Sequence, residues 1–77
     1  MDFQDFVNTV ESSFSKDYPE EFGNYQKSGG ASNGIAKDYL LSAFKEIEYN
    51  KKRFNLSLPE AVSHSAKNAV WNLYMTF

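Results

Sequence analysis

Apolar residues recur at helical spacing through the last part of the chain, from Leu58 to Phe77. Ser57 can accept a hydrogen bond from a free amide of the first turn, and Glu60, three residues later, can accept one from the Ser57 amide. Pro59 is tolerated in this turn because its missing N–H would have no partner there. The pattern predicts a helix over 58–77 whose apolar face consists of Val62, Ala66, Ala69, Val70, Leu73 and Phe77.

The opposite side of this predicted helix is less polar than an ordinary surface helix would be. At about 100° per residue, His64, Trp71 and Met75 fall on one line, roughly half a turn from Leu73. Trp and Met are enriched at contact surfaces. We therefore expect this second stripe, with the neighbouring Tyr74, to be a partner-binding surface. The alternative is that the last helix lies in the centre of the fold and that the stripe belongs to the core.

The N-terminal part of the chain follows the same helical template. Asp2 is a candidate N-cap, and Asp5 places a negative charge in the first turn, where it suits the helix dipole. The residue before a proline avoids helical angles, so the pair Tyr18–Pro19 should end the helix. The pattern predicts a helix over 3–16 with a buried stripe of Phe3, Phe6, Val7, Val10 and Phe14.

A short helical segment is expected near 19–25, with Phe22 and Tyr25 on one side of it. If the last helix is central, this segment is the part of the chain that covers Trp71. A loop rich in glycine and serine follows over 28–34, and either Ser32 or Asn33 can cap the next helix.

The middle of the chain predicts one long helix over 34–53. Lysine and arginine gather at its C-terminal end, as the helix dipole favours, and Asn55 is a candidate left-handed stop. Its buried stripe is expected to consist of Ala36, Leu40, Ala43, Phe44, Ile47 and Phe54. Together these segments predict an all-α fold. It is a compact bundle of three main amphipathic helices (3–16, 34–53 and 58–77) plus the short segment near 19–25, in a single small helical domain of residues 1–77.

Composition narrows the classes of protein to consider. The 77 residues include no cysteine, so neither a disulfide nor a thiolate metal site can form. No apolar run approaches the length of a membrane span and no basic-then-apolar leader is present, so we expect a cytoplasmic protein. The net charge of −2 is far from the basic balance of a general nucleic-acid binder. The aromatic content of 17% is high enough that some rings should reach the surface.

Catalytic chemistry has little support in this sequence. His64 is the single histidine, and its neighbours Ser63 and Ser65 point in other directions on a helix, so they cannot form a triad with it. Glu60 lies four residues before His64 and can hydrogen-bond to it, but two ligands are fewer than a zinc site needs. We therefore expect no enzyme activity, no metal site and no cofactor.

Basic residues gather near the end of the long predicted helix. A cationic strip with an aromatic ring can follow a phosphate backbone and stack on a base. The simpler interpretation is a helix C-terminus supplied with cations. The possible nucleic-acid contacts are Lys45, Tyr49, Lys51, Lys52 and Arg53.

The stretch from Arg53 to Pro59, followed by Glu60 and an apolar helix, resembles the opening of a ribbon-helix-helix repressor. The resemblance implies an alternating strand that pairs with its twin in a dimer and enters the major groove. It covers residues 53–77, and the family has a second helix after the first one. The residues that it would point toward DNA are Arg53, Asn55 and Ser57, and those that it would turn inward are Phe54, Leu56 and Leu58.

The sequence thus favours a small non-enzymatic protein-binding module: an adaptor, an inhibitor or an immunity-type factor that occupies the surface of a partner. The partner would be another protein or a second copy of this chain. The alternative is a small nucleic-acid-binding or transcription-regulating protein that uses Lys51, Lys52 and Arg53. Salt sensitivity separates the two, because binding to nucleic acid should weaken steeply with salt and a contact centred on Trp71 should not.

Overall fold

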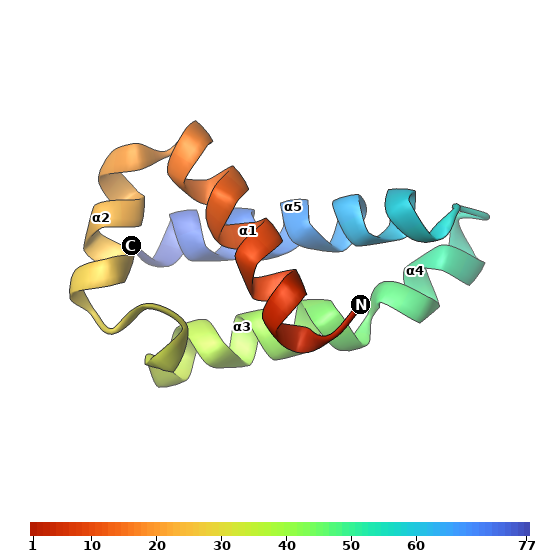
Figure 1. The fold of residues 1–77 in the computed structure, drawn as a ribbon, viewed down its shortest axis with the longest axis horizontal. Coiled ribbons are helices and arrows are strands. Elements are labelled where there is room, and N and C mark those ends of the chain that lie inside the picture. Colours follow the sequence, from red (N-terminus) through yellow and green to blue (C-terminus); the bar gives the residue numbers. More distant parts are fainter.

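The computed structural model describes all residues, Met1–Phe77, and confirms an all-α fold without strands. The molecule measures 36 × 22 × 19 Å. In Figure 1, α5 and the α3–α4 pair run along the long axis, α1 crosses them, and α2 stands at the end where the C-terminus lies. The elements are α1 (Phe3–Asp17), α2 (Pro19–Lys27), the short 3₁₀ helix η1 (Gly30–Ser32), α3 (Gly34–Lys45), α4 (Ile47–Arg53) and α5 (Leu58–Thr76).

Local side-chain caps set the start of three helices. Asp2 Oδ1 accepts a hydrogen bond from the Asp5 amide at 2.8 Å. Asn33 Oδ1 accepts from the Ile35 amide at 3.0 Å and from the Ala36 amide at 3.2 Å, which decides between the two candidate caps of α3. Each cap satisfies amides that have no partner inside the helix.

The capping box of α5 is formed with both of its hydrogen bonds. The Ser57 amide donates to Glu60 Oε1 at 2.9 Å, and the Glu60 amide donates to Ser57 Oγ at 3.3 Å. The hydrogen bond from the Ser57 amide holds the pKa of the Glu60 carboxyl below its usual range.

The long helix predicted over 34–53 is divided at Glu46, and that part of the prediction is wrong. The Glu46 amide is shared between the carbonyls of Ser42 (3.2 Å) and Ala43 (3.3 Å), so the helical turn is tightened there. Figure 1 shows α4 leaving the line of α3 and rising toward the start of α5. This bend lets Ile47 and Asn50 reach the interior.

Phe54 was expected in the buried stripe of this helix, and it is exposed instead. It follows the last residue of α4, and the chain turns away immediately after it. Asn55 has a φ of 52°, as expected of a left-handed stop. The Leu56 amide then donates to the Lys51 carbonyl at 2.9 Å and the Asn55 amide to the Lys52 carbonyl at 3.4 Å, which is the Schellman pattern.

Residues 53–58 therefore contain a helix end, a left-handed turn and a helix cap rather than an alternating strand. The strand that the ribbon-helix-helix resemblance implied is absent, and that expectation is wrong. The physical reason is local, because the αL turn at Asn55 and the cap at Ser57 use the backbone groups that a strand pair would need.

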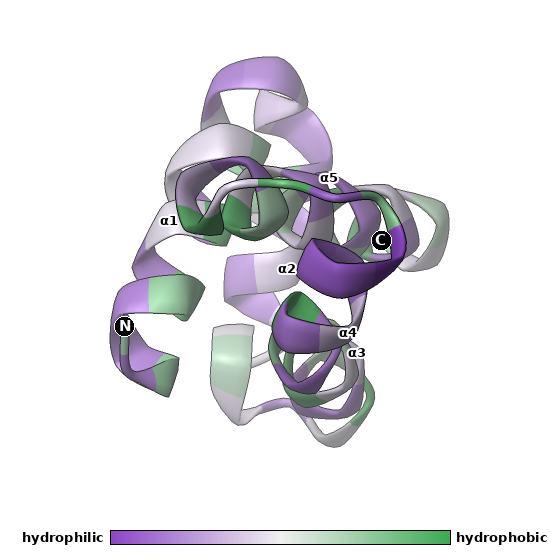
Figure 2. Ribbon diagram, turned by 90° about the vertical axis from the view of Figure 1, so that its right-hand side faces the viewer, coloured by the Kyte–Doolittle hydropathy of each residue, from purple (hydrophilic) through white to green (hydrophobic).

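The core is built from the predicted faces of α1, α3 and α5. In the end-on view of Figure 2, apolar and polar residues alternate along the helices, as expected when each helix has one buried face. Tyr25 of α2 is fully buried, and its ring packs against Phe14 and Phe77. The largest fully buried side chains are Tyr25, Phe6, Phe14, Leu40 and Leu73.

No helix in the structure is both long enough and apolar enough to span a bilayer.

Candidate functional site

The most exposed large apolar side chains of α5 are Trp71 and Met75. They are 55% and 66% exposed, although the nearby residues Val70 and Leu73 are buried. This difference follows from helix geometry, because residues one or two positions apart point in different directions. Burial of Val70 and Leu73 thus holds the helix in place while Trp71 and Met75 face outward.

Tyr74 connects Trp71 to the end of α1. Its half-buried ring lies 5.7 Å from the Trp71 ring and 4.3 Å from the Tyr18 ring, measured between centroids. Tyr18 in turn lies 6.5 Å from the buried Phe14. A row of three rings therefore runs from the core boundary out to the surface. We call Tyr18, Trp71, Tyr74 and Met75 the Trp71 surface.

The short helix α2 does not cover Trp71. Phe22 and Tyr25 each lie 5.6 Å from Phe14, so both rings face α1 and the core. The sequence left open whether this stripe is exposed or belongs to the core. In the structure Trp71 and Met75 are exposed.

His64 does not join Trp71 and Met75, as its place in the predicted stripe suggested. It is half-buried and its ring lies 5.0 Å from the Phe54 ring. It lies seven positions before Trp71, which is about 10 Å along a helix axis. Glu60 Oε1 accepts from the Ser57 amide, so the carboxylate four residues before His64 serves the helix cap.

A second group of side chains surrounds Arg53 at the corner between α4 and α5. The Arg53 guanidinium lies 5.8 Å from the centre of the Tyr49 ring and 5.2 Å from that of Phe54. Arg53 Nη1 also donates to Tyr49 Oη at 3.5 Å. We call Tyr49, Arg53, Phe54 and His64 the Arg53 cluster.

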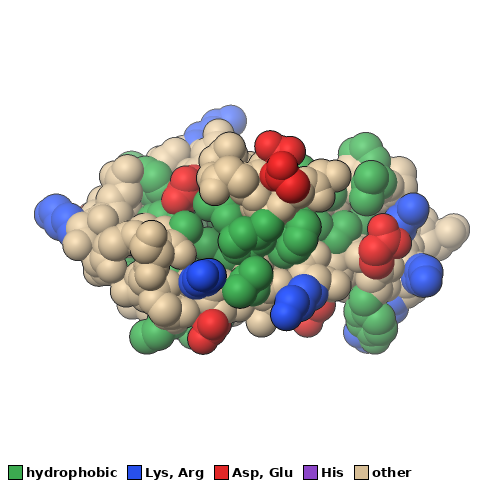
Figure 3. Space-filling model, turned by 60° about the horizontal axis from the view of Figure 1, so that its bottom comes forward, with side chains coloured by type: hydrophobic (Ala, Val, Ile, Leu, Met, Phe, Trp, Pro, Cys, Tyr) green, Lys and Arg blue, Asp and Glu red, His purple; other side chains and the backbone are tan.

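The predicted basic patch is only partly brought together. Lys52 is exposed beside Arg53, and Lys51 is half-buried. Lys45 lies before the bend, on the last turn of α3, where it lines a depression with Phe44 and Leu58. On the face seen in Figure 3, apolar side chains form a central group bordered by both acidic and basic residues, so that face carries no single sign of charge.

A groove between α1 and α5 was not predicted from the sequence. It has a volume of about 480 Å³ and lies where the N-terminal halves of the two helices diverge. Its lining comes from both helices, and residues from α1 such as Thr9 and Ser13 had no apolar signal that could have marked them. Only the crossing of the two helices creates this feature.

No family model matches the sequence, and no curated protein or solved structure matches it either.

Proposed function

We propose that this protein is a small non-enzymatic binding module that acts as an adaptor, inhibitor or immunity-type factor by occupying the surface of a partner protein. The observation that carries this proposal is the position of Trp71, which is 55% exposed and whose ring lies beside Tyr74, which in turn lies beside Tyr18. Tryptophan is enriched among the residues that dominate binding energy at interfaces.

The Trp71 surface has further properties that suit a protein contact. The neighbouring Tyr74 ring restricts the Trp71 ring before binding, so less rotamer entropy is lost on association. Met75 adds a flexible apolar side chain that can adapt to a partner. Asp17 and Lys67 border a depression beside Trp71 and supply a polar rim to an apolar centre.

The test compares two truncations of exposed aromatic residues. The wild type, Trp71→Ala and Tyr49→Ala would each be used to capture interacting proteins, and the captured partner would then be purified for direct binding measurements. We expect Trp71→Ala to weaken binding by at least about 2 kcal/mol, or roughly thirtyfold, whereas Tyr49→Ala should leave it nearly unchanged. Equal binding by the wild type and Trp71→Ala would refute the proposed surface.

Self-association has to be separated from binding to another protein. Light scattering on the wild type and on Trp71→Ala does this directly. A wild-type dimer that Trp71→Ala converts to a folded monomer would assign the Trp71 surface to a second copy of this chain. A wild-type monomer would leave the surface available to a different protein.

The Arg53 cluster supports a second candidate function, nucleic-acid binding. Tyr49 is 58% exposed and Phe54 46% exposed, and both rings touch a guanidinium next to Lys52. Exposed rings beside cations are the elements that bind single strands. Under this alternative, binding to an oligonucleotide should fall steeply with salt and with Lys52→Glu, and Trp71→Ala should not affect it.

A further inference from the structure

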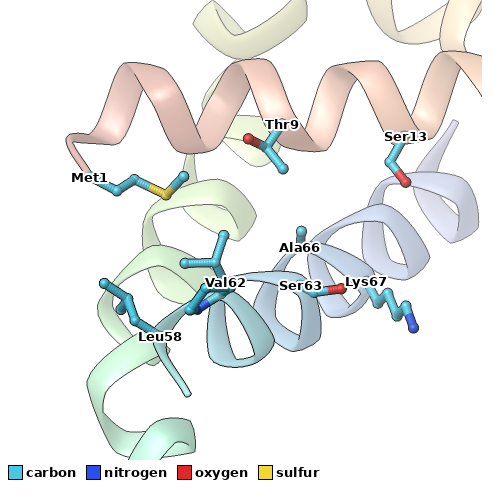
Figure 4. Close-up of a pocket in the computed structure, with 9 residues that line it drawn as sticks. Met1, Thr9, Ser13, Leu58, Val62, Ser63, Ala66 and Lys67 are labelled. Carbon is cyan, nitrogen blue, oxygen red and sulfur yellow. The ribbon is translucent and has the colours of Figure 1, made fainter. Parts of the chain in front are cut away.

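The groove between α1 and α5 has an apolar end and a polar end. Met1 and Leu58 lie at the apolar end and are 56% and 44% exposed, so a large part of their apolar area is in contact with water. Val62 and Ala66 continue the apolar lining along α5 (Figure 4). The Thr9 hydroxyl donates to the Asp5 carbonyl at 2.9 Å. The methyl group of Thr9 is therefore the part left to line the groove.

Polar groups gather at the other end. In Figure 4 the Ser13 hydroxyl points from α1 toward α5, and the Ser63 hydroxyl lies beside Lys67 on α5. Lys67 is exposed and is the only charged side chain among the residues that line the groove. This end therefore offers two hydroxyl groups and one ammonium group.

The dimensions also limit what the groove can hold. Its volume of about 480 Å³ falls within the range of small-molecule sites. From Leu58 to Lys67 the helix rises by roughly 14 Å, about the length of an extended chain of ten to twelve carbon atoms.

We infer that the α1–α5 groove binds a single-chain amphipathic carboxylate, such as a medium-chain fatty acid. The alkyl chain lies along Val62 and Ala66 toward Leu58 and Met1, and the carboxylate reaches Ser13, Ser63 and Lys67. Burial of the chain supplies the affinity, and the ammonium and hydroxyl groups set the direction in which the ligand lies. This site contains none of the four residues of the Trp71 surface, although Ser13 and Lys67 also line the depression beside Trp71. The inference does not rest on the proposed protein-binding function.

One acidic residue near the polar end of the groove opposes this orientation of the ligand. Asp17 lines the depression beyond Lys67, together with Tyr18 and Trp71, and it can compete for the same ammonium group. It lies outside the groove lining, whereas Ser13 and Lys67 line both spaces. The expected contribution of Lys67 is accordingly that of an exposed ion pair and not of a buried one.

Decanoate is a suitable probe, since it remains monomeric at useful concentrations and is ionised at pH 7.5. We would titrate it into ¹⁵N-labelled protein and follow the amide signals by NMR. Saturable shifts are expected at Thr9, Ser13 and residues 62–67. Decanol should bind more weakly and decyltrimethylammonium more weakly still. Shortening the acid should weaken binding by up to about fourfold per methylene group.

Two substitutions at exposed positions test the polar end. Lys67→Gln should weaken decanoate binding about two- to fivefold and leave decanol binding unchanged. Ser63→Glu places a negative charge at the carboxylate position and should weaken decanoate binding by at least about fivefold. Asn68→Glu is the matched control, because it adds the same charge to an exposed position of α5 outside the groove. Its affinity for decanoate should stay within about twofold of the wild-type affinity.

Several results would overturn the inference. These are equal binding of decanoate and decyltrimethylammonium, shifts centred on Trp71 or Phe54, or a Ser63→Glu variant that binds decanoate as the wild type does. A wild-type dimer that Ser63→Glu dissociates would also overturn it, because the groove would then hold a second copy of this chain.

Discussion

Asn50 Nδ2 donates a hydrogen bond of 3.1 Å to Ser65 Oγ in the interior between α4 and α5. Asn50 is 5% exposed and Ser65 is fully buried, and apart from Tyr25 they are the only buried residues that carry a polar side-chain group. A buried polar group without a partner is costly, so this pair favours the one alignment of α4 and α5 in which the two groups meet.

We expect that removing either partner destabilises the protein by about 1–3 kcal/mol, since the other partner is then left buried without its hydrogen bond. Asn50→Ala, Ser65→Ala and the double variant would be compared by urea denaturation. The double variant should lose less stability than the sum of the two single losses. Asn68→Ala, at an exposed position of α5, should change stability by no more than about 0.5 kcal/mol. Strictly additive losses would show that the two side chains are not coupled.

The left-handed turn at Asn55 makes opposite predictions for two small substitutions. Its φ of 52° costs an ordinary L-residue about 1–2 kcal/mol, whereas glycine adopts it without a Cβ penalty. Asn55→Ala should therefore lower the thermal midpoint by several degrees and Asn55→Gly should not. If both variants melt alike, the left-handed turn does not limit the stability of this corner.

The buried Tyr25 hydroxyl donates to Glu11 Oε2 at 2.7 Å and should make stability depend on alkaline pH. Burial raises the pKa of Tyr25 well above its ordinary value near 10, and the Glu11 carboxylate raises it further. A raised folded-state pKa means that this contribution is complete below pH 10 and is lost as the pH rises toward the folded value.

Tyr25→Phe tests this dependence. At pH 7 it should reduce stability by about 1–2 kcal/mol, because Glu11 loses its hydrogen-bond donor. Above pH 10 the difference in free energy of unfolding between Tyr25→Phe and the wild type should narrow, because only the wild type must then keep a buried hydroxyl protonated in order to fold. Tyr49→Phe, which alters an exposed ring, is the matched control. A gap between wild type and Tyr25→Phe that stays constant from pH 7 to 11 would contradict the prediction.

The capping box should make the free energy of unfolding depend on pH in the acidic range. The pKa of Glu60 is lowered by its hydrogen bond from the Ser57 amide, so its contribution is complete above its ordinary value near 4.5. It is lost as the pH falls through the lower folded value. In Glu60→Gln the free energy of unfolding should therefore change less as the pH falls than it does in the wild type. Glu60→Asp keeps the charge but is too short to reach the Ser57 amide, and it should behave like Glu60→Gln. An unchanged acid slope in Glu60→Asp would assign the effect to the helix dipole instead.

Most of the helix ends could be predicted from the sequence because each of them is set within a few residues. Asp2, Asn33 and Ser57 accept hydrogen bonds from amides two or three positions away, and Asn55 adopts its turn from its own backbone preference. The apolar faces of α1 and α5 were predictable for a related reason, because a periodic stripe shows which side of a helix must be buried.

The bend at Glu46 was not predictable in the same way. The apolar stripe of α3 continues without a break into Ile47, and no proline or glycine marks a division. The α4 helix tilts where it packs against α5. This packing moves Asn50 into the core and leaves Phe54 outside, which is the reverse of what their polarity suggests.

The sequence by itself determined the all-α class, most of the helix ends and the presence of more aromatic residues than a small core must bury. Only the tertiary structure decided that Trp71 and Met75 stay uncovered, that His64 pairs with Phe54 and that a groove opens between α1 and α5. Caps and periodicity depend on neighbours along the chain. Exposure depends on which helix crosses over a given face, and that is set by packing between residues far apart in sequence.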